Sequence, residues 1–146
     1  MRLCLTLLVL QILNAATALA AGADSPLGLW EAFDSDSGKA TGRMRVFQEG
    51  ELFFGRSEAV PTNPVVDARC TKCKDERKDQ PLVGLLVMRN MRADKGEYSG
   101  GDILDPSTGK VYSCKFHLTD DGKQLVLRGF LGVPMLGGTQ VWRRIN

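Results

Sequence analysis

The segment SGGDILDPSTGKVYSCKF, residues 99–116, decides the fold class because it reads as a strand, a tight turn and a second strand. Asp105 and Pro106 predict a type I turn, since proline presets φ and aspartate hydrogen-bonds to the backbone beyond it. Gly109 supplies the left-handed residue that closes a bulged hairpin. Beyond the turn, apolar side chains alternate along one face of the strand: Tyr112, Cys114, Phe116 and Leu118. This period of two predicts a β-sheet with one buried face.

Short apolar runs and alternating patterns recur along the chain, and polar or glycine-containing turns separate most of them. They predict strands at residues 28–33, 41–48, 52–56, 82–88, 97–104, 110–118, 124–130 and 139–145. The run at 82–88 is almost continuously apolar, so a helix is the alternative there; Gly84, two valines and the short length favour a strand. The predicted fold class is all-β, a single small antiparallel up-and-down barrel of about eight strands, with a two-sheet sandwich as the alternative.

Residues 1–20 have the features of a secretory signal peptide. Arg2 precedes an apolar run over residues 3–13, and Ala18-Leu19-Ala20 provides a small-residue cleavage site. The apolar run is too short to span a membrane. We therefore expect an exported protein, periplasmic or secreted, with one domain over residues 21–146 and no transmembrane segment in the mature chain.

Charge and motifs exclude several classes of function. The formal net charge is +2, which is too small for the field that nucleic-acid binding requires. His117, the single histidine, falls on the outward face of its predicted strand, and no serine nucleophile, paired-carboxylate motif or metal box accompanies it. We therefore expect a protein that is not an enzyme and that carries no cofactor and no metal.

The connection from Pro61 to Pro81 is long and polar, and it contains Cys70-Thr71-Lys72-Cys73. Loops of this length are usually functional or disordered. Its charged run alternates in sign, which is typical of a solvated surface. In an oxidising compartment a Cys70–Cys73 disulfide with Cys114 as a buried free thiol is the preferred interpretation. A bridge from Cys114 to either loop cysteine, a redox pair and a zinc site with Cys114 and His117 are the alternatives.

Trp30 lies in a G-x-W triplet near the first strand, and Trp142-Arg143-Arg144 lies on the last. This pairing resembles the arrangement in lipocalin-like barrels. The resemblance implies that the first-strand tryptophan seals one end of the barrel and that an arginine late in the chain stacks across it. Five motifs together resemble a family of small exported bacterial proteins of unknown function with a lipocalin-like barrel. The motifs are GLW at 28–30, RKDQPLVGL at 77–85, GGDILDPSTGKVYSCK at 100–115, LRGFLG at 127–132 and GTQVWRR at 138–144.

The resemblance implies a barrel but no established activity. A barrel of this strand number can enclose one small ligand, so we expect a small apolar or amphipathic molecule inside it. The candidate ligand-binding residues are Trp30, Arg45, Tyr98, Tyr112 and Arg128. The alternative is an envelope protein-interaction module whose protein partner contacts the 61–81 loop.

Overall fold

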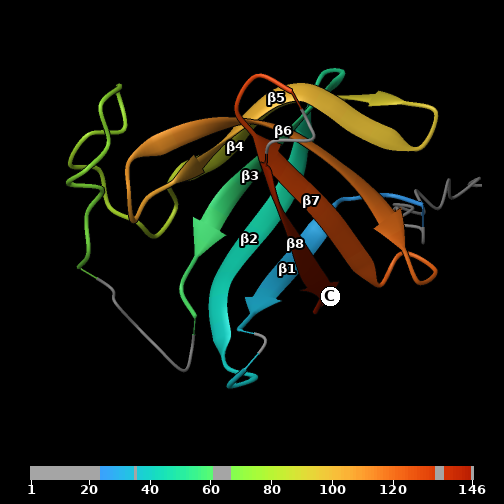
Figure 1. Ribbon diagram of the computed structural model, residues 1–146, viewed down its shortest axis with the longest axis horizontal. Coiled ribbons are helices and arrows are strands. Elements are labelled where there is room, and N and C mark those ends of the chain that lie inside the picture. The colour runs from blue at the N-terminus through green and yellow to red at the C-terminus, as the bar shows by residue number, and fades with distance from the viewer. Residues whose placement is uncertain (1–23, 35, 61–66, 134–136, 146) are drawn as a thin grey trace, which may run out of the picture.

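The computed structural model describes residues 24–34, 36–60, 67–133 and 137–145, which form an eight-stranded closed barrel. Each strand pairs antiparallel with the next, and β8 returns to β1 (Figure 1). The strands are β1 (Gly28–Phe33), β2 (Ala40–Glu49), β3 (Leu52–Glu58), β4 (Leu86–Asp94), β5 (Glu97–Asp105), β6 (Lys110–Thr119), β7 (Gln124–Phe130) and β8 (Gly137–Arg144). The predicted up-and-down barrel is confirmed, and the chain is not a two-sheet sandwich. Within the described residues, no helix is long and apolar enough to cross a membrane.

Seven of the eight predicted strands agree with the structure to within two residues at each end, but the fourth is displaced. Residues 82–85 form a turn, in which the Leu85 N–H donates to the Leu82 carbonyl and Gly84 has a φ of +83°. β4 instead spans Leu86–Asp94, so it begins four residues later and ends six residues later than predicted. The apolar run led to a wrong prediction because Leu85 lies in a turn rather than in a strand, and its side chain is nevertheless buried, with 2% exposed.

The hairpin that decides the fold forms as predicted between β5 and β6. The Asp105 carboxylate accepts hydrogen bonds from the Ser107 N–H at 2.9 Å and the Ser107 hydroxyl at 2.6 Å. The Gly109 N–H donates to the Asp105 carbonyl at 2.8 Å, and Gly109 has a φ of +74°. Aspartate, proline and glycine therefore fix the turn, and the alternation of β6 then places Cys114 and Phe116 in the core.

Large side chains fill the half of the barrel where β1 begins and β8 ends. The Tyr98 ring stacks on Phe116 with centroids 4.5 Å apart and meets the edge of Phe53 at 5.0 Å. Around this aromatic group lie other fully buried side chains, among them Met44, Met88, Met91 and Leu125. Each such side chain contributes about 1.5–3 kcal/mol when it is buried. This half of the barrel is therefore a packed core.

The end of this packed half is closed by Arg144 and Trp30. The Arg144 guanidinium lies 4.2 Å from the centroid of the Trp30 ring, and the Trp30 indole N–H donates to the Pro26 carbonyl at 2.8 Å. Arg144 also donates to the carbonyls of Gly122, Leu27 and Ser25. The seal that the lipocalin-like resemblance implies is therefore present, and Arg144 is its arginine. We call this the closed end.

The opposite end, which we call the mouth, carries the connections β1–β2, β3–β4, β5–β6 and β7–β8. Residues 67–81 of the β3–β4 connection, drawn in yellow-green in Figure 1, are a folded segment that we call the cap. An isolated bridge between Arg69 and Pro81 joins the two ends of the cap, and the Cys70 carbonyl accepts from the Asp79 N–H at 3.0 Å. Backbone hydrogen bonds of this kind give the cap a defined shape.

Candidate ligand cavity

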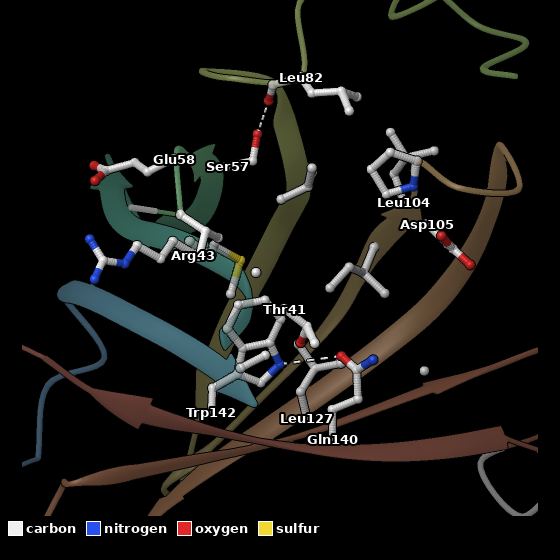
Figure 2. Close-up of a pocket in the computed structure, with 18 of the residues that line it drawn as sticks. Thr41, Arg43, Ser57, Glu58, Leu82, Leu104, Asp105, Leu127, Gln140 and Trp142 are labelled. Atoms are coloured by element: carbon white, nitrogen blue, oxygen red, sulfur yellow. Dashed lines mark hydrogen bonds between the residues drawn. The ribbon is translucent and has the colours of Figure 1, made fainter. Parts of the chain in front are cut away.

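A cavity of about 790 Å³ occupies the mouth half of the barrel. Side chains from every strand face it, and Figure 2 shows several of them converging on the space. Its apolar wall includes Ala32, Met44, Val60, Val87, Ile103, Leu104, Tyr112, Leu127 and Trp142. The barrel is therefore packed at its closed end and hollow at its mouth.

The cavity exists because small residues take inward positions near the mouth. Toward the closed end, the same strands carry large inward residues. On β1, Ala32 lines the cavity two residues after the buried Trp30. On β7, Gly129 lines it two residues after Leu127, and a Cβ placed on Gly129 would lie 3.6 Å from the Tyr112 Cβ. That distance is an ordinary contact, so a Cβ fits at this position against Tyr112 and Ile103, and a longer side chain would extend from there toward the cavity that Gly129 lines.

Two polar side chains of β8 rise into the cavity beside one another (Figure 2). The Trp142 indole N–H donates to the Gln140 amide oxygen at 3.3 Å. Trp142 also covers Gly42 on β2, since a Cβ built there would lie 3.5 Å from the indole ring. A Cβ at position 42 would therefore make an ordinary contact with the ring, and Gly42 and Trp142 lie against each other on this side of the cavity.

The charged groups of the cavity wall are held by protein partners. Arg43 forms an ion pair with Glu31, and Glu58 forms one with Arg45. Burial raises the pKa of Asp105, but the hydrogen bonds that it accepts from Ser107 outweigh this effect, and its pKa is lowered overall. Asp105 is therefore ionised at neutral pH.

Of the five residues predicted to bind a ligand, the structure places Tyr112 on the cavity wall. Trp30 lies in the closed-end seal, and Tyr98 belongs to the aromatic core, where burial raises the pKa of its phenol. Arg45 faces outward in its ion pair with Glu58, and Arg128 donates to the Thr139 hydroxyl at 2.8 Å. Neither arginine lines the cavity, because each occupies an outward position next to a buried neighbour, Val46 or Leu127.

Sequence reasoning did not select Gln140, Ala32, Gly129 or Trp142 as cavity residues. Trp142 was noted only as part of the lipocalin-like motif, although it lies on the wall and Arg144 forms the seal. The available signal was a change from large to small inward residues toward one end of the barrel. That signal becomes readable only when the register between strands is known, because it compares residues from different strands at the same height.

The cap contains the confirmed disulfide, Cys70–Cys73, and Cys114 is a buried free thiol. The alternative bridges from Cys114 are therefore wrong. The zinc interpretation also fails on geometry, since Cys114 is buried and His117, three residues on, is exposed on the other face of β6. Burial raises the pKa of the Cys114 thiol to about 12, and the nearby Asp102 carboxylate acts in the same direction. Cys114 is accordingly an inert core residue.

The expectation that the charged run of the cap is a solvated surface is wrong for Arg77, which is 2% exposed. Its guanidinium donates to both oxygens of Asp75 and to the Leu86 carbonyl at 3.0 Å. The hydrogen bonds from Arg77 to Asp75 lower the pKa of Asp75 to about 2. Because a buried arginine without partners is costly, Arg77 ties the cap to the first residue of β4.

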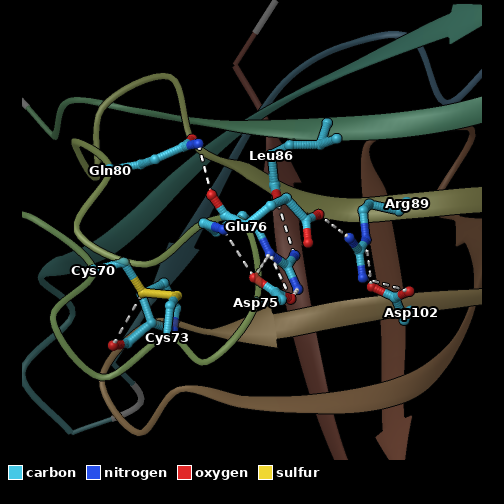
Figure 3. A network of polar contacts seen from close by, with 10 residues as sticks. Cys70, Cys73, Asp75, Glu76, Gln80, Leu86, Arg89 and Asp102 are labelled. Atoms are coloured by element: carbon cyan, nitrogen blue, oxygen red, sulfur yellow. Dashed lines mark hydrogen bonds and ion pairs between the residues drawn. A yellow bond between two sulfur atoms is a disulfide. The ribbon is translucent and has the colours of Figure 1, made fainter.

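Arg89 makes a second attachment between the cap and the barrel (Figure 3). Its guanidinium bridges Glu76 of the cap at 2.7 Å and Asp102 of β5 at 3.0 Å. Cys70 and Cys73 are buried and belong to the same hydrophobic core cluster as the inward residues of the barrel. The cap is therefore part of the folded core. Whether a protein partner contacts this segment stays a prediction.

The fold and the cavity define a lipocalin-like barrel. One solved structure supports this class, described as "Protein HP1028 from the human pathogen Helicobacter pylori belongs to the lipocalin family". It matches with a TM-score of 0.68 and 15% sequence identity, over 84% of each chain, and at that identity the likeness shows the fold alone. Residues 28–144 match the family described as "Uncharacterized protein conserved in bacteria (DUF2147)", and the chain belongs to that family. No curated protein matches the sequence.

Proposed function

We propose that this protein is an exported, non-enzymatic carrier that binds a small apolar or amphipathic molecule in the mouth cavity. One observation carries the proposal: the barrel is sealed and packed at one end, yet holds an open cavity of about 790 Å³ at the other. Ligand pockets in proteins commonly have volumes of about 300–1,000 Å³ and largely apolar walls. The disulfide is compatible with an oxidising compartment, which supports export.

The two tryptophans offer a direct test, because Trp142 lines the cavity whereas Trp30 is fully buried at the closed end. Bromine atoms quench tryptophan fluorescence on contact. A glycerol monoester of 9,10-dibromostearic acid should therefore quench the wild type in a saturable manner. The variant W142F, which keeps only Trp30, should show little quenching.

A cavity-filling variant provides the matched control. Gly129→Leu should abolish saturable quenching, because its side chain would enter the cavity from a position with ordinary contacts and no positive φ. Val141→Leu changes the exposed outer face of β8 and should bind like the wild type. Saturable quenching that persists in Gly129→Leu, or that comes from Trp30, would refute the cavity as the binding site. Native mass spectrometry of protein purified from its own cells would then identify any retained ligand.

A further inference from the structure

The charges of the cavity wall are unsuited to an acidic headgroup. Arg43, Glu58 and Asp105 are the charged residues among those that border it within the described chain. The side chains of Arg43 and Glu58 occupy outward positions, next to the inward Met44 and Ser57, and Figure 2 shows their charged groups pointing away from the cavity. Arg43 is neutralised by Glu31, which is 7% exposed and therefore depends on this partner. A ligand carboxylate that drew Arg43 away would leave the Glu31 carboxylate buried with a weaker partner, at a cost that offsets the new ion pair.

The remaining wall charges are negative or balanced. Glu58 is balanced by Arg45, while Asp105 is an ionised carboxylate held by hydrogen bonds to neutral groups of Ser107. The wall with its partners therefore has a net charge of about −1 at neutral pH, since aspartate is ionised there. A fatty-acid anion that entered the cavity would lose its hydration and approach the Asp105 carboxylate. No cation of the cavity wall is available to pair with it.

Neutral hydrogen-bond donors are, in contrast, available beside the apolar wall. The Gln140 amide oxygen already accepts from Trp142, so the amide nitrogen with its two N–H groups is the end that a ligand would meet. Figure 2 shows this amide within the cavity, above the strand that carries it. Such a donor suits an ester, amide or hydroxyl oxygen.

From this arrangement, and resting on the proposed function, we infer that the cavity selects uncharged amphiphiles with a hydrogen-bond-accepting headgroup over fatty-acid anions of the same chain length. The apolar wall takes the acyl chain, and the Gln140 amide donates to the headgroup oxygen. Arg43 remains paired with Glu31 and takes no part in binding the ligand.

The test compares two probes that share one acyl chain: the glycerol monoester of 9,10-dibromostearic acid and the 9,10-dibromostearate anion. Quenching titrations of the wild type at pH 7.5, below the micelle-forming concentration of each probe, should give a Kd for the monoester lower by on the order of tenfold or more. Equal affinities, or tighter binding of the anion, would overturn the inference while leaving the proposed carrier function intact. Saturable binding of neither probe would overturn both.

Adjacent positions of β8 provide a variant and its control. Gln140→Arg places a cation on the cavity wall and should reverse the preference, so that the anion binds more tightly than the monoester. Val141→Arg adds the same charge on the outer face and should keep the wild-type ratio. If Gln140→Arg does not fold, Asp105→Asn serves instead: it keeps a turn-forming acceptor, removes the negative charge and should narrow the ratio of the two Kd values several-fold. An unchanged ratio in the folded variants would refute the electrostatic selection.

Discussion

The Arg144 guanidinium, 4.2 Å from the centroid of the Trp30 ring, joins the last strand to the first at the closed end of the barrel. It also donates to three backbone carbonyls, at 2.8 Å to Gly122, 2.6 Å to Leu27 and 2.6 Å to Ser25. The entry segment before β1 and the β6–β7 turn are thus held by one side chain. Since β1 and β8 share only three register pairs, this side chain reinforces the seam where the barrel closes.

Arg144→Ala should lower the free energy of unfolding by about 3 kcal/mol, because it removes a cation–π contact and leaves several carbonyls without a donor. Arg144→Lys should lie between the alanine variant and the wild type, since an ammonium group cannot reproduce the planar fork of donors. Urea unfolding measures both. The control is Arg143→Ala, where the guanidinium lies 4.8 Å from the Phe33 ring centroid on the exposed face. Equal losses for Arg143→Ala and Arg144→Ala would show that the seal contributes nothing specific.

The barrel was predictable because inward residues such as Met44, Cys114 and Phe116 repeat with a period of two, and because local turn chemistry at Asp105 and Gly109 fixes the hairpin. Both signals are contained within a few residues of sequence. The closed-end seal was predictable only through the resemblance, since Trp30 and Arg144 lie near opposite ends of the domain's sequence. Alternation alone assigns a side, inside or outside, and does not assign a height along the barrel axis.

The position of an inward residue along the barrel axis decides whether it lines the cavity or packs in the core. Tyr98 and Tyr112 both face inward, yet Tyr98 stacks in the filled half and Tyr112 lines the cavity. Bulges shift the registers further, for example where Asn90 has a φ of +59° and Gly100 a φ of +82°. The role of the cap depended on side-chain contacts that a charge pattern does not reveal. The buried Arg77 guanidinium donates to Asp75 and to the Leu86 carbonyl.

Gly109 lies directly beneath the cap, which provides a second prediction. A Cβ on this residue would lie 1.8 Å from the Lys72 carbonyl oxygen, in addition to the strain of a φ of +74°. Gly96, in the β4–β5 turn, has a similar φ of +84° but open space around its Cβ position. The two glycines therefore separate backbone strain from contact with the cap.

Gly96→Ala should cost about 1 kcal/mol, the strain of a left-handed residue with a side chain. Gly109→Ala should cost about 2 kcal/mol more, because the cap backbone must move away from β6. Chemical denaturation of the two variants gives the comparison, and hydrogen exchange should show increased opening within residues 67–81 for Gly109→Ala only. Equal costs would contradict the close approach of Lys72 to Gly109.

The third prediction concerns the carboxylate that supports Arg77. Hydrogen bonds from Arg77 lower the pKa of Asp75 from 3.8 to about 2, although partial burial opposes this shift. A lowered pKa means that the unfolded chain binds the proton more readily than the folded one. Stability from Asp75 is therefore fully present above about pH 4 and is lost as the pH falls through about 2.

Asp75→Asn removes the titrating group, so between pH 4 and pH 2 the wild type should lose up to about 2 kcal/mol more stability than this variant. Urea unfolding at pH 7, 4, 3 and 2 measures the difference. At pH 7 the variant should be less stable than the wild type, because Arg77 keeps its buried charge with a weaker partner. Asp121→Asn, in the exposed β6–β7 turn where Asp121 has a φ of +50°, is the matched control because asparagine tolerates that conformation. Parallel pH profiles for the wild type and Asp75→Asn would mean that Asp75 does not anchor Arg77 in the folded cap.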